Sequence, residues 1–254
     1  MLSLSSAALS AIGGRATNQD MLGSAYEDEL ACFVLSDGVG GHRGGEIASR
    51  IVVDSLLERF SQEALFGERA LRSYVDNASM QVARRKREMP GLSNMSATVA
   101  AALIDRHRRH ALFAHLGDTR VYQFRQARML SCTKDHSLIQ QFIDAGYCTA
   151  AQLHTHPLRS TLFAAVGIES ETAINPIDNT VLLESGDAIL LCTDGFWEWI
   201  ASDDMAQALG DAATVDDWLD RMAAVADAAS HASGRERDNA SAIAIWLGTP
   251  QCAS

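Results

Sequence analysis

The sequence contains no hydrophobic run of the length needed to cross a bilayer. The two longest apolar stretches, residues 97–104 and 181–192, are short enough for strands, and Glu184 and Asp187 interrupt the second. The N-terminus carries no basic residue before Arg15, so we interpret it as a first strand rather than as a signal peptide. These absences disfavour a membrane-spanning protein.

Prolines and linkers are also scarce. Only four prolines occur among 254 residues, no Gly/Ser-rich or Pro-rich stretch divides the chain, and no segment repeats. A chain of this length can bury one large core. We therefore expect a single domain over residues 1–250, followed by a short tail at residues 251–254.

The sequence also has few basic residues and no paired cysteines. The chain has 21 Lys and Arg residues against 32 Asp and Glu residues, and its net charge of -11 repels phosphate backbones and anionic lipid. Its five cysteines include no C-x-x-C pair and form no disulfide framework. The composition thus predicts a protein of the reducing cytoplasm that binds neither nucleic acid nor membranes.

The hydrophobic pattern predicts strands and helices in separate runs rather than in strict alternation. Apolar residues recur at helical spacing from Glu46 to Phe60, and a second helix is predicted from Glu68 to Glu88. Four apolar segments joined by short polar breaks then predict an antiparallel meander. This pattern favours an α+β fold over a doubly wound parallel sheet. The meander strands are placed at residues 97–105, 110–118, 120–125 and 128–132, other strands at 31–36, 180–193 and 241–247, and other helices at 136–145, 196–200, 203–209 and 215–230.

Four aspartates occupy corresponding positions at the ends of predicted buried strands. Asp37 and Asp194 each follow a strand and precede a glycine. Asp118 follows a third strand, and Asp238 precedes the last one. Strand ends meet at the rim of a sheet, where grouped carboxylates repel one another unless a cation neutralises them. Each aspartate taken alone fits a turn cap better, but four in this position favour a site for Mg²⁺ or Mn²⁺.

Two short polar segments add candidate ligands. The densest glycine stretch runs from Asp37 to Glu46, but it lacks the Gly-Lys-Ser/Thr ending of a Walker A loop and opens no dinucleotide-binding unit. The segment GGRATNQD places Arg15 close to Asn18 and Asp20. A guanidinium there can be an ordinary surface group or a clamp for phosphate oxygens.

Together these segments resemble the PPM family, the metal-dependent type 2C serine/threonine protein phosphatases, in their compact bacterial form. The matching blocks extend from Gly13 to about Leu247 in family order. They read GGRATNQD, VLSDGVGGHRGGE, MSATVAAALI, HLGDTRVYQFR, SCTKDHSLIQQFIDAG, ILLCTDGFWEWI and RDNASAIAI. The resemblance implies an αββα sandwich, in which two antiparallel sheets are flanked by helices and the metal ions lie at one end.

The resemblance also implies the metal ligands. Asp37 matches the carboxylate that bridges two metal ions, and Gly38 matches the residue whose backbone carbonyl binds one of them. Asp194 and Asp238 match the ligands of the other ion. Asp20 matches a position that contacts the metals mainly through water.

Three further assignments follow from the same resemblance. Asp118 matches the aspartate of a third, weaker metal site of bacterial members, and Arg15 matches the phosphate-binding arginine. Residues 146–167 match a variable flap beside the site. Three departures are visible, of which one is the loose match of the flap residues 158–167. Gln19 stands where the family usually has Glu, and His42 lies farther from the bridging aspartate than the family's proposed histidine acid, so His42 is not assigned as the general acid.

The other prominent side chains are interpreted as structural. Trp197 and Trp199 are expected to pack against the core. His154 and His156 form an H-x-H pair that no nearby cysteine or carboxylate completes, so a flap loop is favoured over a zinc site. His136 is expected to make local hydrogen bonds.

The implied function is hydrolysis of phosphoserine and phosphothreonine in proteins. Two Mn²⁺ or Mg²⁺ ions, with a possible third at Asp118, would share a water of lowered pKa, and the bridging hydroxide would attack phosphorus while Arg15 offsets charge on the phosphoryl oxygens. No protein nucleophile is needed, in agreement with the absence of a C-x5-R phosphatase loop. The expected partners are a phosphorylated protein and a bacterial Ser/Thr kinase whose action this monomer reverses.

Two alternatives remain open. A non-catalytic relative could use the same fold to bind a partner, and its support is Gln19 and the loose match of the flap residues 158–167. A metal-dependent hydrolase of small phosphate esters is the other. Retention of the four strand-end aspartates favours the protein phosphatase.

Overall fold

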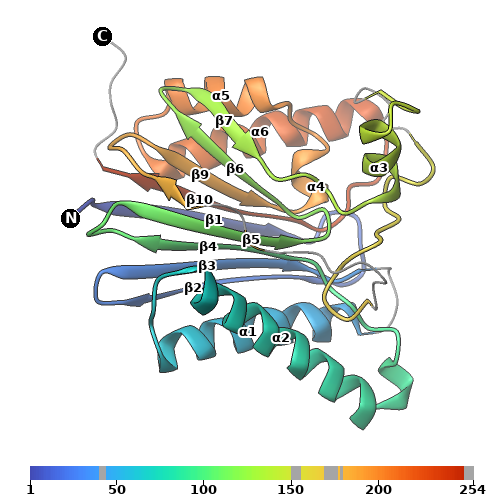
Figure 1. Ribbon diagram of the computed structural model, residues 1–254. Coiled ribbons are helices and arrows are strands. Elements are labelled where there is room, and N and C mark those ends of the chain that lie inside the picture. Colours follow the sequence, from blue (N-terminus) through green and yellow to red (C-terminus); the bar gives the residue numbers. More distant parts are fainter. Residues whose placement is uncertain (40–43, 150–155, 169–176, 178–179, 249–254) are drawn as a thin grey trace.

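The computed structural model describes residues 1–39, 44–149, 156–168, 177 and 180–248. Within these residues the chain forms two five-stranded antiparallel sheets that lie face to face (Figure 1). The first sheet has the order β1-β10-β9-β6-β7, and its strands are β1 (Leu4–Ala11), β6 (Arg120–Arg125), β7 (Arg128–Cys132), β9 (Ala188–Cys192) and β10 (Ala240–Leu247). The second has the order β2-β3-β4-β5-β8, and its strands are β2 (Asp20–Glu27), β3 (Leu30–Asp37), β4 (Val99–Asp105), β5 (His110–Leu116) and β8 (Val181–Leu182).

Helices cover the outer face of each sheet, so the molecule has four layers (Figure 1). The α1 helix (Gly45–Gln62) and the α2 helix (Glu68–Glu88) pack on the second sheet, and a short 3-10 helix (Pro90–Leu92) follows them. The α5 helix (Ser202–Asp211) and the α6 helix (Val215–Ser233) cover the first sheet. The short helices α3 (Leu138–Asp144) and α4 (Asp194–Trp197) lie at one end of the sandwich. The predicted αββα architecture is confirmed.

Alternation along the buried strands builds three apolar cores. On β4, Ala100, Ala102 and Ile104 face the opposite sheet, whereas Val99 and Leu103 face α1 and α2. Burial on both faces explains why these strands are almost continuously apolar rather than alternating with polar residues. The third core lies between the first sheet and the helices α5 and α6.

The predicted four-strand meander is wrong. The β4–β5 and β6–β7 pairs are antiparallel hairpins, but β5 belongs to the second sheet and β6 to the first. The chain crosses between the sheets at Gly117, whose φ of 106° is open to glycine and whose added Cβ would lie 2.6 Å from Thr98 Cγ2. Strands 181–182 and 188–192 are likewise split between the two sheets. Because β5 and β6 are buried on both faces, apolar periodicity does not mark which sheet each of them joins.

The remaining elements follow the predicted pattern with one omission. The α2 helix spans the predicted residues 68–88, and α1, α3, α5 and α6 agree within a few residues. The α4 helix begins at Asp194, two residues earlier than predicted. Sequence inspection missed β2, in which Gly23 and small polar residues weaken the apolar pattern. The predicted tail, residues 251–254, lies outside the described residues.

Candidate active site

A cavity of about 500 Å³ collects most of the predicted site residues. It opens where β3, the β5–β6 crossover, α4 and the segment before β10 come together. Asp20 lies beside this cavity, because it pairs directly with Asp37 across β2 and β3. The predicted residues that line the cavity are Arg15, Asp37, Gly38, Asp118, Asp194 and Asp238.

Backbone hydrogen bonds place Asp37 and Gly38 at the end of β3. The amide of Asp37 donates to Thr98 Oγ1 over 2.9 Å, and the amide of Gly38 donates to the Gln19 carbonyl over 3.1 Å. A Cβ on Gly38 would lie 2.5 Å from the carbonyl carbon of Gly45. Glycine is therefore required where α1 approaches the strand end.

The two carboxylate oxygens of Asp20 have different surroundings. Thr193 Oγ1 donates to Asp20 Oδ2 over 3.1 Å. The other oxygen, Oδ1, is buried without a hydrogen-bond partner in the described part of the chain. A buried carboxylate oxygen in this state is costly unless a cation or water satisfies it.

Asn239 joins the N-terminal loop to the segment before β10. Its side-chain amide donates to the carbonyls of Ile12 and Thr17, and its Oδ1 accepts from the amide of Gln19 over 2.8 Å. This connection brings Arg15 to Asp238, and their side chains form an ion pair of 2.5 Å. The predicted phosphate-binding arginine thus stands next to a predicted metal ligand.

The carboxylates raise one another's pKa in the absence of cations. Burial, together with the charges of Asp20, Asp194, Asp118 and Asp238, raises the pKa of Asp37 well above its usual range. Burial raises the pKa of Asp194 in the same direction, and the charge of Asp118 is the largest electrostatic contribution to this rise. The same desolvation raises the pKa of Asp118 to about 7 and that of Asp20 to about 6.

The carboxylates of the cavity have the chemistry of divalent-cation ligands, although they do not form a complete coordination shell. Within the described residues, no three Asp, Glu, His or Cys side chains form a ready-made coordination shell. The donor set is nevertheless oxygen-only, and its members repel one another in a polar cavity open to water. Hard cations that keep several water ligands, such as Mg²⁺ and Mn²⁺, suit such a set.

Sequence inspection missed Glu198 and Arg159, which both line the cavity. Arg159 Nε donates to Glu198 Oε1 over 3.0 Å, and the Arg235 guanidinium lies 3.7 Å from Glu198 Oε2. The spacing offered a signal, because Glu198 follows Asp194 by four residues, which is about one helical turn. Arg159 belongs to the predicted flap, so at least this described part of the flap reaches the cavity.

The residues interpreted as structural have mixed outcomes. Trp197 is buried as expected, but its indole also donates to the carbonyl of Asp118 over 2.9 Å. Trp199 packs against the core as expected, but it also lines the cavity, where the Arg235 guanidinium lies 5.0 Å from its ring centre. His136 makes a hydrogen bond, but not the expected local one, because its Nδ1 accepts from the amide of Gly117, 19 residues earlier in the chain, over 3.2 Å. His156 Nδ1 accepts from the Leu158 amide within the flap.

His42 and His154 lie outside the described residues. Gln19, the predicted departure from the family pattern, lines the cavity, and its side chain donates to Glu46 Oε2 over 3.3 Å. No helix in the described residues is long and apolar enough to span a bilayer.

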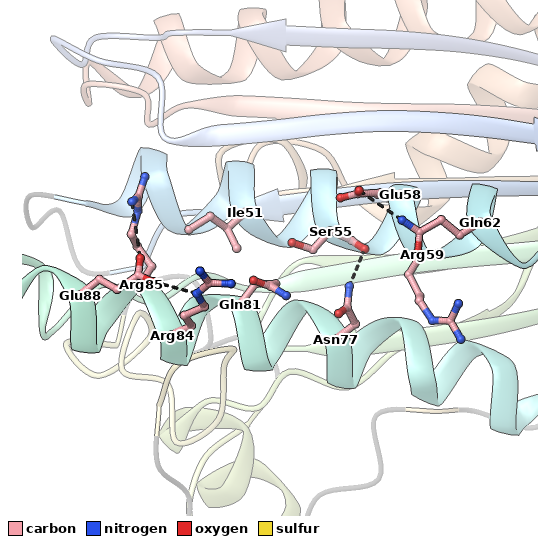
Figure 2. A pocket seen from close by; sticks show the side chains of 10 residues that line it. All are labelled: Ile51, Ser55, Glu58, Arg59, Gln62, Asn77, Gln81, Arg84, Arg85 and Glu88. Carbon is pink, nitrogen blue, oxygen red and sulfur yellow. Dashed lines mark hydrogen bonds and ion pairs between the residues drawn. The ribbon is translucent and has the colours of Figure 1, made fainter.

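A second hollow of about 440 Å³ lies between α1 and α2 (Figure 2). Its basic side chains already have acidic partners, since Arg84 pairs with Glu88 over 2.7 Å and Arg59 pairs with Glu63 over 2.7 Å. None of the predicted site residues lines it. The acidic cavity, rather than this hollow, is therefore the candidate active site.

Comparison with known proteins agrees with the fold. A family model described as protein phosphatase 2C matches residues 9–240, and the chain therefore belongs to the protein phosphatase 2C family. It is a metal-dependent protein serine/threonine phosphatase, which acts on phosphorylated proteins.

Three similar proteins illustrate the relationship. The serine/threonine protein phosphatase PstP of Mycobacterium tuberculosis is 31% identical over 199 residues, which are 77% of this chain and 36% of PstP. The protein phosphatase PhpP of Streptococcus pneumoniae is 28% identical over 205 residues, which are 78% of this chain and 80% of PhpP. A structure of the catalytic domain of PstP in complex with two manganese ions has a TM-score of 0.80 and 25% identity, and covers 98% of this chain and 100% of that chain.

Proposed function

We propose that Asp37, Gly38, Asp194 and Asp238 hold two Mn²⁺ or Mg²⁺ ions, with Asp20 next to them. The observation that carries this proposal is the group of mutually repelling carboxylates around one cavity. The unpartnered Oδ1 of Asp20 points to the same need for a cation or its bound water. The two manganese ions in the PstP catalytic domain support the choice of metal. Asp118 would hold a third, weaker ion.

Divalent ions in this site would supply Lewis acidity that activates water for attack on phosphorus. The chain's own contribution begins with Arg15, which pairs with Asp238 over 2.5 Å and is half exposed at the cavity. With Asp238 holding a metal ion, the Arg15 guanidinium would be available to bind two phosphoryl oxygens of the substrate. Arg15 then orients the phosphoryl group and stabilises the negative charge that develops on its oxygens.

Water is the proposed nucleophile because the cysteines are unsuited to the role. Burial raises the pKa of the Cys32 thiol to about 12, and it raises that of the Cys192 thiol well above its usual range. A protonated, buried thiol is a poor nucleophile. None of the described cysteines lines the acidic cavity.

The test is metal-dependent hydrolysis of p-nitrophenyl phosphate and of phosphoserine and phosphothreonine peptides. We expect activity with Mn²⁺, loss of activity with EDTA, and a fall in kcat/KM of at least about 100-fold for Asp37→Asn, because even second-shell changes cost metal sites 10- to 100-fold. Asp54→Asn is the matched control, since Asp54 is exposed on α1. Turnover that survives both EDTA and Asp37→Asn would refute the proposal. Faster turnover of metabolite esters than of phosphopeptides would favour a small-ester phosphatase.

We further propose that residues 1–250 act as one phosphatase domain, a cytoplasmic monomer that opposes a bacterial Ser/Thr kinase. The four described cysteines are free thiols, which supports a reducing compartment. Exposed apolar side chains such as Tyr26 and Met80 come from different elements, and Met129 and Leu130 are the pair that shares one strand, β7, among the described residues. Light scattering after gel filtration tests the monomer, and a dimer mass would refute it.

A further inference from the structure

The backbone around Asp118 is held from two sides at the crossover between the sheets. On one side, the amide of Gly117 donates to His136 Nδ1 over 3.2 Å, and the amide of His136 donates back to the Gly117 carbonyl over 2.9 Å. On the other side, the indole of Trp197 donates to the Asp118 carbonyl over 2.9 Å. The Thr119 hydroxyl forms a further hydrogen bond of 2.5 Å with the Thr98 hydroxyl.

Trp197 is itself fixed by a buried ion pair. The Arg120 guanidinium lies 3.4 Å from the centre of the Trp197 ring, and it makes two hydrogen bonds of 2.7 and 2.8 Å to Asp135. The Asp135 side chain is 3% exposed. Because α4 carries both Asp194 and Trp197, one short helix positions one carboxylate directly and the Asp118 backbone through the indole.

His136 is fixed by two aromatic contacts. Its ring stacks on His115 with centroids 4.6 Å apart and meets Phe163 edge-on at 5.7 Å. Burial and the neighbouring His115 lower the pKa of His136 to about 4, so the imidazole is neutral and its Nδ1 can accept the Gly117 amide. The His136 carbonyl accepts from the Phe163 amide over 3.0 Å, which joins the flap to the same loop.

We propose that Trp197 and His136 are positioning residues that hold the backbone of Asp118 in place for binding a divalent cation. The inference rests on the proposed assignment of Asp118 as a metal ligand. A carboxylate on a crossover between two sheets has no strand ladder of its own to fix it. The indole and the imidazole supply that rigidity. Losing either group therefore lowers the affinity for the ion at Asp118, while the ions at the other aspartates remain bound.

The chain offers a matched control for Trp197. Trp218 on α6 is also buried, and its indole donates to the Met205 carbonyl over 3.0 Å. Trp218 lies against α5 and Phe124 rather than at the acidic cavity. Trp197→Phe and Trp218→Phe therefore each remove an indole donor from a buried backbone carbonyl. Only the first of these carbonyls belongs to Asp118.

The experiment is a titration of the full-length, metal-stripped protein with Mn²⁺, in which free Mn²⁺ is counted by electron paramagnetic resonance. We expect Trp197→Phe to raise the Kd of the weakest bound Mn²⁺ about tenfold and to leave the Kd of the tighter ions unchanged. Trp218→Phe should change the Kd of none of the ions. His136→Phe removes the acceptor and should weaken the same ion, whereas His136→Asn places an amide oxygen near the Nδ1 position and should restore it.

The outcomes separate the inference from the function on which it rests. Equal Mn²⁺ binding by Trp197→Phe and Trp218→Phe overturns the role of Trp197. If His136→Asn binds the weakest Mn²⁺ no more tightly than His136→Phe does, the role of His136 is overturned. This pair of variants also provides the test if Trp197→Phe does not fold. If Asp118→Asn loses no ion, the assignment of Asp118 fails and the inference fails with it, while hydrolysis of p-nitrophenyl phosphate by the wild type still tests the phosphatase function.

Discussion

Replacing Asp118 by Asn should stabilise the metal-free protein at alkaline pH. Burial raises the pKa of Asp118 from 3.8 to about 7, so the folded state resists ionising this carboxyl group. Between these two pKa values the folded chain binds more protons than the unfolded chain, and stability therefore falls as the pH rises. A difference of about 3 pH units corresponds to a penalty of about 4 kcal/mol, complete above about pH 7. An asparagine side chain carries no such penalty.

The assay is thermal and urea unfolding in EDTA at pH 5 and pH 8. Because part of the penalty is already present at pH 5, the gain from Asp118→Asn should be larger at pH 8 by about 3 kcal/mol. For a domain of this size a gain of about 4 kcal/mol corresponds to a rise in Tm of about 10 °C. Saturating Mn²⁺ should reverse the order, since it stabilises the wild type more than the variant.

Asp135→Asn is the control, and it should lower the free energy of unfolding rather than raise it. Asp135 is as buried as Asp118, but it makes two hydrogen bonds to Arg120. Its loss leaves a buried guanidinium without its counter-ion, which costs about 3–5 kcal/mol. If Asp118→Asn destabilises the metal-free protein at pH 8, or if its effect does not depend on pH, the argument that burial penalises the ionised Asp118 carboxyl is wrong.

Two further substitutions test the scaffold. Gly195→Ala should abolish folding or metal binding, because the added Cβ would lie 2.1 Å from the backbone oxygen of Asn239; a soluble variant with wild-type Mn²⁺ affinity would contradict this close packing. Arg125→Met should cost about 3–5 kcal/mol in urea unfolding because it leaves the fully buried Asp187 without its ion-pair partner, while Mn²⁺ affinity stays the same; an unchanged unfolding midpoint would show that this pair does not stabilise the fold.

Local pattern was sufficient for most of the elements. Helical spacing of apolar residues located the helix over residues 68–88. Apolar runs followed by Asp located the end of β3 at Asp37 and the end of β9 two residues before Asp194. These features are encoded within a few residues, so they can be read without knowing the fold. The β2 strand was missed because its glycine and small polar residues lack this local signal, and its stability comes from pairing with β3 along its whole length.

By itself, the sequence determined the α+β class, the positions of the strand-end aspartates and the likeness to the type 2C phosphatases, because each depends on residue types at short spacing. The tertiary structure alone decided that β5 and β6 belong to different sheets, that Arg159 reaches Glu198, and that Trp197 holds the Asp118 carbonyl. These contacts join residues from 39 to 79 positions apart, so no local pattern carries them. They arise only when two buried sheets pack face to face and bring their connecting loops to one end.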